Sequence, residues 1–165
     1  MTVPLSILDL TPIKQGGSAS ATFRETLELN GWTDRCTLIT GFGAYDRSGY
    51  LDVDTQQVLD APTEAAGCIA VKPLDDWYSG ISADRLPFHR RVWLKIDVEG
   101  AEVEVIAGAK KLIADHRPVI QVENHLFRRP SIATEVKAAL EPLGYQLTYY
   151  KPYGVNVSHS VFYPV

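Results

Sequence analysis

Acidic side chains follow apolar runs at three separate places in this sequence. Asp97 follows VWLKI, Asp9 follows SIL, and Glu123 follows VIQV. In open parallel sheets, ligands bind outside the carboxyl ends of the strands. A carboxylate at such a position can bind a ligand hydroxyl or act as a general base. We therefore expect Asp9, Asp97 and Glu123 to line a ligand cleft at one edge of a sheet.

Helix capping is the alternative role for the acids that follow residue 97. An acid in the first turn of a helix interacts favourably with the helix dipole, which contributes up to about 1 kcal/mol. We favour capping for Glu102 and Glu104 and a ligand-binding role for Asp97. Gly100 lies between Asp97 and Glu102. We expect this glycine to be required by the backbone, because a side chain there would crowd the cleft or strain the turn.

Strands and helices alternate along the chain, which predicts a mostly parallel α/β sheet. Apolar, β-branched runs bounded by turn residues predict strands, and apolar residues at helical spacing predict helices. The last two strands follow each other without a helix, so we expect that end to be antiparallel. Residues 44–55 are expected to form a turn and a short hairpin, and residues 55–71 a loop. The predicted strands are residues 5–10, 36–42, 92–98, 119–124, 145–151 and 160–165, and the predicted helices are 21–31, 73–81, 101–116 and 131–144.

The composition is that of a single soluble globular domain covering residues 1–165. Hydrophobic residues make up 45% of the chain and charged residues 22%, which are ordinary values. The net charge of −4 gives no basic footprint for nucleic acid, and no apolar run approaches the length of a membrane span. The first ten residues lack the features of a signal peptide, so we expect a cytoplasmic protein. Exposed strand edges would favour self-association.

Several segments together resemble one enzyme family. The segment LKIDVEGAEVEVIAGAKKLI, followed by RPVIQVEN, resembles the signature region of the FkbM family of S-adenosylmethionine-dependent methyltransferases. Residues 23–53 are similar to the part of the family in which a helix ends in Asn-Gly and a strand follows. VKPLDDW (residues 71–77) and LDLTP (residues 8–12) are similar to two further elements of the family. The resemblance therefore extends over nearly the whole chain.

The resemblance implies a fold, a reaction and roles for individual residues. It implies a Rossmann-like sheet and transfer of a methyl group from S-adenosylmethionine to a hydroxyl oxygen of a small molecule or glycan. By position, Asp9 would bind the ribose hydroxyls of the cofactor, and Asp46 would lie near its adenine. Asp97 would lie near the methionine part and the transferred methyl group, where it could orient the substrate or act as general base. Glu123 would face the substrate.

The glycine loop Asp-x-Gly-x-x-x-Gly with which family members normally begin is not found in this sequence. Gly16-Gly17 lie seven and eight residues after Asp9, not two and six. Two interpretations stay open. In one, the chain is shortened, residues 5–10 are the second strand, and S-adenosylmethionine binds weakly or not at all. In the other, residues 3–10 are the first strand and residues 11–20 form a changed cofactor loop. The shortened form leads to the alternative function of a non-catalytic remnant or binding module.

Histidines and metal ligands are less well defined by the sequence. Of the four histidines, His125 alone falls at the expected cleft, and we favour a surface or loop position for it over a catalytic role. Asp97, Glu99, Glu123 and His125 could together form an oxygen-rich metal site. Their spacing along the chain does not match a metal-binding motif, so we predict no metal.

Overall fold

The computed structural model describes residues 19–31, 33, 43–52, 55, 57–62, 68–79 and 93–165. The chain divides into two compact units, one formed by Leu5–Gly41 and the other by Met1–Pro4 with Phe42–Val165. The described part of the smaller unit is helix α1 (Ala19–Leu29) with the turn after it. Asn30 ends this helix by donating from its side-chain amide to the carbonyl of Thr26, at 2.8 Å, and Gly31 has a φ of +64°. The helix predicted over residues 21–31 is thus confirmed.

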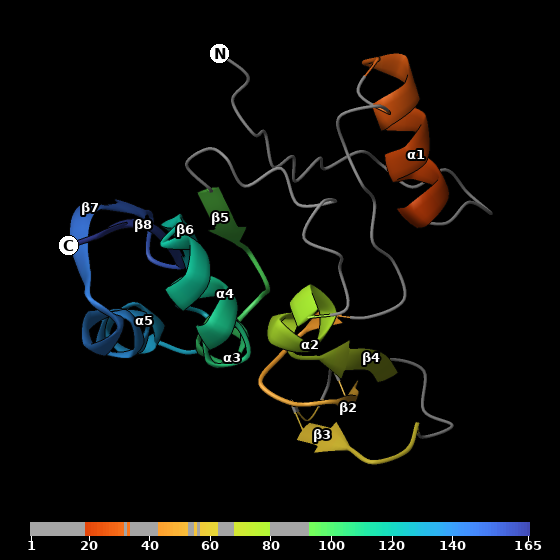
Figure 1. Cartoon of the computed structure of the whole chain (residues 1–165), viewed down its shortest axis with the longest axis horizontal. Coiled ribbons are helices and arrows are strands. Elements are labelled where there is room, and N and C mark those ends of the chain that lie inside the picture. The colour runs from red at the N-terminus through yellow and green to blue at the C-terminus, as the bar shows by residue number, and fades with distance from the viewer. Residues whose placement is uncertain are drawn as a thin grey trace. The chain divides into compact units, whose positions relative to one another are not determined.

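The C-terminal sheet of the larger unit has the strand order β5-β6-β8-β7 (Figure 1). Its strands are β5 (Trp93–Ile96), β6 (Val119–His125), β7 (Tyr145–Tyr153) and β8 (Val157–Pro164). β5 and β6 are parallel, whereas β6 pairs with β8 and β7 with β8 in antiparallel fashion. The predicted parallel pairing between residues 92–98 and 119–124 is therefore confirmed, as is the antiparallel C-terminal end.

A second four-stranded sheet precedes it in the chain, with the order β1-β4-β2-β3. β1 and β4 are parallel, and β2 is antiparallel to both β3 and β4. Of the hairpin predicted over residues 44–55, only β2 lies within that range, and its hairpin partner β3 follows it. The prediction of a loop over residues 55–71 is wrong, because short strands form there by pairing with β2 and with β1. The strands are β1 (Gly43–Ala44), β2 (Gly49–Asp52), β3 (Gln57–Leu59) and β4 (Cys68–Lys72).

The described residues thus form a mixed α/β fold with two four-stranded sheets. Two of the described strand pairs, β1–β4 and β5–β6, are parallel, and the other four are antiparallel. The mostly parallel pattern predicted from the sequence is therefore found only in part among the described strands. The predicted strands at residues 5–10 and 36–42 lie outside the described residues. No helix in the described part of the chain has both the length and the apolar character that a membrane span requires.

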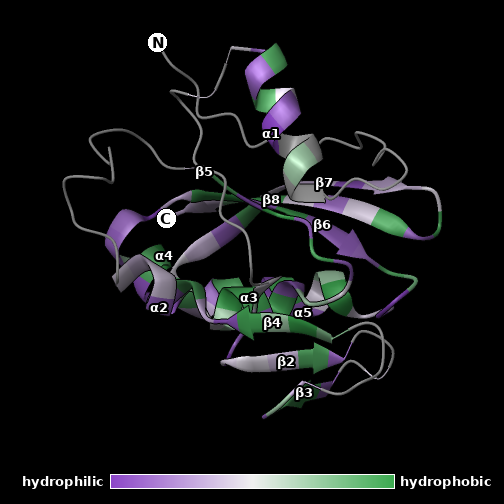
Figure 2. Cartoon of the chain, turned by 90° about the vertical axis from the view of Figure 1, so that its right-hand side faces the viewer, coloured by the Kyte–Doolittle hydropathy of each residue, from purple (hydrophilic) through white to green (hydrophobic). Residues whose placement is uncertain are grey.

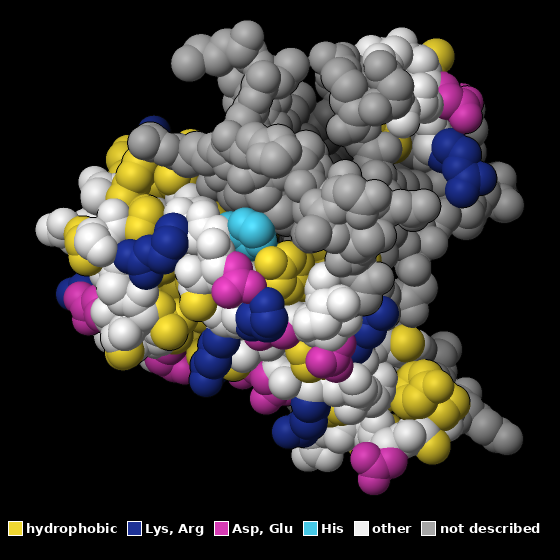
Figure 3. All heavy atoms as spheres, in the orientation of Figure 1, with side chains coloured by type: hydrophobic (Ala, Val, Ile, Leu, Met, Phe, Trp, Pro, Cys, Tyr) yellow, Lys and Arg dark blue, Asp and Glu magenta, His cyan; other side chains and the backbone are white. Residues whose placement is uncertain are grey.

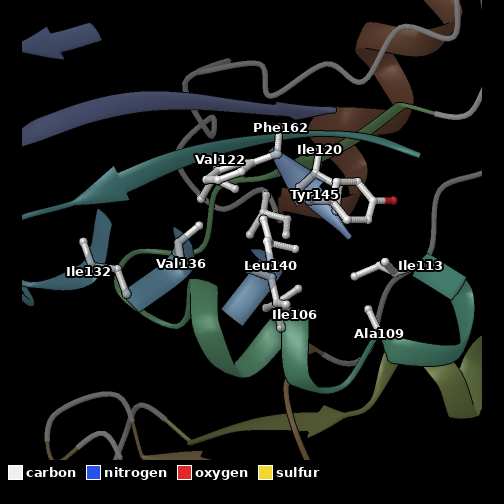
Figure 4. Close-up of a cluster of buried hydrophobic side chains, with 12 residues drawn as sticks. Ile106, Ala109, Ile113, Ile120, Val122, Ile132, Val136, Leu140, Tyr145 and Phe162 are labelled. Atoms are coloured by element: carbon white, nitrogen blue, oxygen red, sulfur yellow. The ribbon is translucent and has the colours of Figure 1, made fainter. Parts of the chain in front are cut away.

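Apolar side chains from three helices and the C-terminal sheet form the main core (Figure 4). In α5 (Ile132–Leu140), Ile132, Val136 and Leu140 are fully buried, as their spacing predicts. Figure 2 shows hydrophobic residues in these three helices and in the strands of this sheet. Each fully buried side chain of this size contributes about 1.5–3 kcal/mol. The other buried members are Ile96, Val105, Ile106, Ala109, Ile113, Ile120, Val122, Tyr145 and Phe162.

The helix predicted over residues 101–116 is interrupted, giving α3 (Glu102–Ala107) and α4 (Lys110–His116). The interruption lies at Gly108, against which the backbone of Tyr45 packs. The carbonyl of Gly108 accepts a hydrogen bond from the backbone N–H of Asp75, at 2.9 Å, instead of continuing the helical ladder. Tertiary contacts therefore end α3, although the apolar pattern continues through this position.

Asp75 in helix α2 (Leu74–Ser79) caps the N-terminus of α4 from outside that helix. Its two carboxylate oxygens accept hydrogen bonds from the backbone N–H groups of Lys111, at 2.8 Å, and Leu112, at 2.9 Å. These donors have no partner within the helix, so the carboxylate satisfies groups that would otherwise lack one.

Replacing Asp75 with alanine should lower the free energy of unfolding by about 1–2 kcal/mol, because two amides at the start of α4 lose their acceptor. Chemical denaturation of Asp75→Ala measures this loss. Asp76→Ala is the matched control, since Asp76 is the next residue of α2 and is exposed. Equal destabilisation by both variants would contradict the capping role.

Strand β7 forms one edge of the C-terminal sheet within the described residues. Its pairing with β8 shifts register between Leu147 and Tyr149, which marks a β-bulge or similar irregularity. All six residues from Thr148 to Tyr153 are exposed, among them Lys151 and Pro152. The aromatic residues of this strand beyond Tyr145 therefore lie on the surface.

Candidate functional site

The carboxyl ends of the parallel strands β5 and β6 bring the predicted acids together. Asp97 directly follows β5, and Glu123 lies near the end of β6, where the register places Ile96 beside Val122. Ligand atoms of Asp97, Glu123 and His125 all lie within 4.8 Å of one another. Asp97 and Glu123 thus lie together at the strand ends, as their positions in the sequence predict.

His125 is the centre of this cluster. The residue is 3% exposed, and its Nε2 atom lies 3.7 Å from Asp97 Oδ1 and 3.9 Å from Glu123 Oε1. Glu99 Oε1 lies 3.5 Å from the same nitrogen. The prediction of a surface or loop position for His125 is wrong, because β6 extends to residue 125 and His125 falls on the same face as Glu123.

Glu102 contacts the other nitrogen of the His125 ring. Its side chain is fully buried, and Oε1 lies 2.7 Å from His125 Nδ1 and accepts the backbone N–H of Gly100 at 3.1 Å. An ionised carboxylate only accepts hydrogen bonds, so with Glu102 ionised the His125 ring would donate from Nδ1. The predicted capping role of Glu102 is therefore incomplete, since its main partner is a side chain 23 residues further along the chain.

The turn between β5 and α3 brings these acids toward His125. Glu99 has a φ of +55° and Gly100 a φ of +109°. A Cβ at Gly100 would lie 2.9 Å from the Cβ of Arg128 and would impose an unfavourable dihedral. The expected backbone role of Gly100 is confirmed by both observations.

In Asp97 and Glu123, the carboxylate oxygen that lies farther from His125, here called the outer oxygen, contacts a basic side chain. Lys95 Nζ lies 2.9 Å from Asp97 Oδ2, and His159 Nε2 lies 3.2 Å from Glu123 Oε2. The inner oxygens, Asp97 Oδ1 and Glu123 Oε1, are the ones nearest His125. These contacts orient both carboxylates, and one oxygen of each lies near His125 Nε2.

Arg129 connects the segment after β6 to two helices through hydrogen bonds. Its guanidinium donates to Glu104 Oε1 in α3, at 3.0 Å, and to Glu135 Oε1 in α5, at 3.1 Å. Hydrogen bonds from the Ser131 hydroxyl and from Arg129 hold the pKa of Glu135 below its ordinary value. The carbonyl of His125 accepts the backbone N–H groups of Arg128 and Arg129. The end of β6 is therefore tied to both neighbouring helices.

Of the two remaining predicted cofactor residues, only Asp46 is described, and it does not belong to the cluster. Asp46 is exposed in the turn after β1, and Asp9 lies outside the described residues. Their roles stay predictions. On the face shown in Figure 3, acidic and basic side chains are interspersed over the described surface, and neither sign forms a broad patch.

Comparison with protein families gives a match over most of the chain. The model of the methyltransferase FkbM domain matches residues 41–147. The chain belongs to this family of methyltransferases. The match includes β5, the turn at Gly100, and β6. It therefore contains the acid–histidine cluster, which consists of Asp97, Glu99, Glu102, Glu123 and His125.

A solved structure has a similar fold. The crystal structure of methyltransferase FkbM from Methylobacillus flagellatus KT superimposes with a TM-score of 0.56 at 22% sequence identity. The similarity covers 87% of this chain and 33% of that one, so the chain spans about a third of that protein's length. The comparison with curated proteins gave no match.

Proposed function

We propose that this domain transfers a methyl group from S-adenosylmethionine to a hydroxyl oxygen of a small molecule or glycan. The observation that carries the proposal is the acid–histidine cluster at the carboxyl ends of β5 and β6, within the segment matched by the FkbM domain. This edge is where open α/β sheets bind their ligands. An alternative is that the domain binds the acceptor without transferring a methyl group.

The cluster supplies the two functions that methyl transfer to oxygen requires of the protein. The cofactor, when bound, supplies an electrophilic methyl group on a sulfonium. A hydroxyl attacking it must be oriented and must lose its proton as the C–O bond forms and the C–S bond breaks. Asp97 and Glu123 have one oxygen each near His125 Nε2, where a hydroxyl could be held and deprotonated. Asp9, Asp46 and Asp97 remain the proposed cofactor contacts.

Replacing Asp97 with asparagine should lower methyl transfer on the order of a hundredfold or more, because the charge that positions the hydroxyl and accepts its proton is lost. Asparagine preserves the size and one acceptor, so the melting temperature should change little. Transfer of a labelled methyl group to a panel of hydroxylated acceptors, alongside thermal melting, separates the two effects. Asp76→Asn, on the exposed side of α2, serves as control. Unchanged turnover with a lowered melting temperature would assign Asp97 a structural role.

Titration calorimetry with S-adenosylmethionine and with its demethylated product distinguishes the two interpretations of the N-terminal segment. Low-micromolar affinity would favour a changed cofactor loop in residues 11–20. Binding about a hundredfold weaker would favour the shortened form, because two or three polar contacts to the cofactor would be missing. Absence of both binding and transfer would favour the binding-module alternative over catalysis.

A further inference from the structure

We propose that Asp97, Glu123 and His125 form a binding site for a divalent transition-metal cation. The three side chains offer two carboxylate oxygens and one imidazole nitrogen within 4.8 Å of one another. They come from the ends of two adjacent parallel strands whose register is fixed by backbone hydrogen bonds. The site therefore rests on rigid elements rather than on an exposed loop.

The ligand atoms lie slightly farther apart than they would around a bound ion. Metal–ligand bonds of about 2.0–2.2 Å place neighbouring ligand atoms roughly 3.0–3.5 Å apart in octahedral or tetrahedral geometry. The His125 Nε2 atom lies 3.7 Å from Asp97 Oδ1 and 3.9 Å from Glu123 Oε1. Small rotations of the side chains would close these gaps around a cation.

The environment of His125 is that of a metal ligand. Metal-binding histidines almost always donate their second ring N–H to a carboxylate, a carbonyl or water. His125 Nδ1 lies 2.7 Å from the fully buried carboxylate of Glu102, and the ring packs edge-on against Phe127. Within the described residues, Nε2 makes no hydrogen bond and faces the carboxylates. A neutral ring that donates from Nδ1 to Glu102 would direct the lone pair of Nε2 toward these carboxylates.

The carboxylates are oriented in the same way. Lys95 binds the outer oxygen of Asp97, and His159 binds the outer oxygen of Glu123. Such partners fix the direction in which a ligand oxygen points and commonly surround metal sites. Each of the three candidate ligands thus has one atom held by the protein and one that lies within 4.8 Å of the ligand atoms of the other two.

The grouping of acids around His125 would favour a cation. Lys95 pairs with one carboxylate and His159 with another, and the carboxylates of the cluster surround the ring of His125. Either a metal ion or a protonated His125 could supply the missing positive charge, and these two possibilities predict opposite results in a metal titration. Four carboxylates lie 2.7–3.9 Å from the ring nitrogens, those of Asp97, Glu99, Glu102 and Glu123.

The ligand types indicate which cations would bind. Imidazole nitrogen suits Fe²⁺, Ni²⁺, Cu²⁺ and Zn²⁺, and the two carboxylates also suit Mn²⁺, whereas Ca²⁺ and Mg²⁺ prefer sites built only of oxygen. Three protein ligands leave positions open for water or a substrate hydroxyl, and a bound cation lowers the pKa of such a hydroxyl. This role in methyl transfer rests on the proposed function. Metal binding itself does not, and it is measurable without cofactor or acceptor.

Titration with Mn²⁺ followed by electron paramagnetic resonance tests the site on the intact chain. We expect saturable binding of one ion per chain, and a coupling to imidazole nitrogen in the spin-echo spectrum. Asp97→Asn and Glu123→Gln should each weaken binding tenfold or more, on the order found when metal-site groups are removed. Glu141→Gln, an exposed acid at the end of α5, is the matched control and should bind as the wild type does.

Two results of the Mn²⁺ titration would contradict the metal site. Lack of saturable binding at about 1 mM Mn²⁺, or equal affinity in the wild type and both site variants, would overturn the metal site. The cluster would then be an ion network centred on protonated His125. Circular dichroism melting of each variant ensures that a loss of binding is not a loss of folding. Because the probe is the metal alone, failure of methyl transfer would leave a positive result intact.

Discussion

Replacing Gly108 with alanine should lower the free energy of unfolding by about 3 kcal/mol or more. The added Cβ would overlap the carbonyl oxygen of Tyr45 and would lie 2.9 Å from its carbonyl carbon and 3.2 Å from the Cα of Pro73. All three atoms belong to the backbone, so no side-chain rotation relieves the overlap. Separation of the segments would also break the hydrogen bond from Asp75 N–H to the Gly108 carbonyl.

Gly43→Ala is the matched control for this prediction. Its Cβ would lie 3.5 Å from a methyl group of Val71, an ordinary contact, so we expect a change within about 1 kcal/mol. The φ of Gly108 is −83°, which any residue adopts, so the expected loss comes from the overlap and not from the dihedral angle. Chemical denaturation of the two variants measures the difference. Equal stability of the two would mean that Tyr45 does not pack against α3.

Removal of the Glu102 carboxylate should be similarly damaging. Glu102→Ala would leave His125 Nδ1 and the Gly100 N–H without their acceptor and would open a cavity beside the fully buried position. Breaking a buried pair of this kind costs about 3–5 kcal/mol. Denaturation of the variant should therefore show a loss approaching the whole stability of a marginally stable domain.

Glu102→Gln separates the hydrogen bonds of this residue from its charge. Glutamine has nearly the same shape and keeps an acceptor for both donors, so we expect a loss of about 1–2 kcal/mol, the difference between charged and neutral hydrogen bonds. Equal losses in Glu102→Ala and Glu102→Gln would show that charge alone matters. A negligible loss in both would show that the His125 contact does not contribute to stability.

The parts of this site that depend on strand ends were predictable from the sequence. Asp97 and Glu123 follow apolar runs, and parallel pairing places such residues at one edge. The contact between Glu102 and His125 was not predictable in this way. It depends on the left-handed turn at Glu99 and Gly100 and on the last residue of β6, and no local pattern specifies either.

In the core and at the helix boundaries, too, features set by local sequence were predictable and features set by distant contacts were not. Ile132, Val136 and Leu140 are buried as their spacing predicts, because helical periodicity is a local property. The break at Gly108 was missed because the apolar pattern continues across it. Its cause is a backbone contact with Tyr45, more than sixty residues earlier in the chain. The short strand β4 was missed for a related reason, since it depends on pairing with β1 and β2.

The irregular edge strand β7 of the C-terminal sheet affects the tendency of the protein to aggregate. A flat, uninterrupted edge strand can template the growth of ordered aggregates, and natural proteins prevent this with bulges, prolines and charged residues. β7 combines a register shift after Leu147 with Lys151 and Pro152 in its exposed half. We therefore expect this edge to resist the addition of further strands, so that the self-association anticipated from the sequence would have to use another surface. Concentrated solutions should accordingly remain free of fibrils seeded along β7.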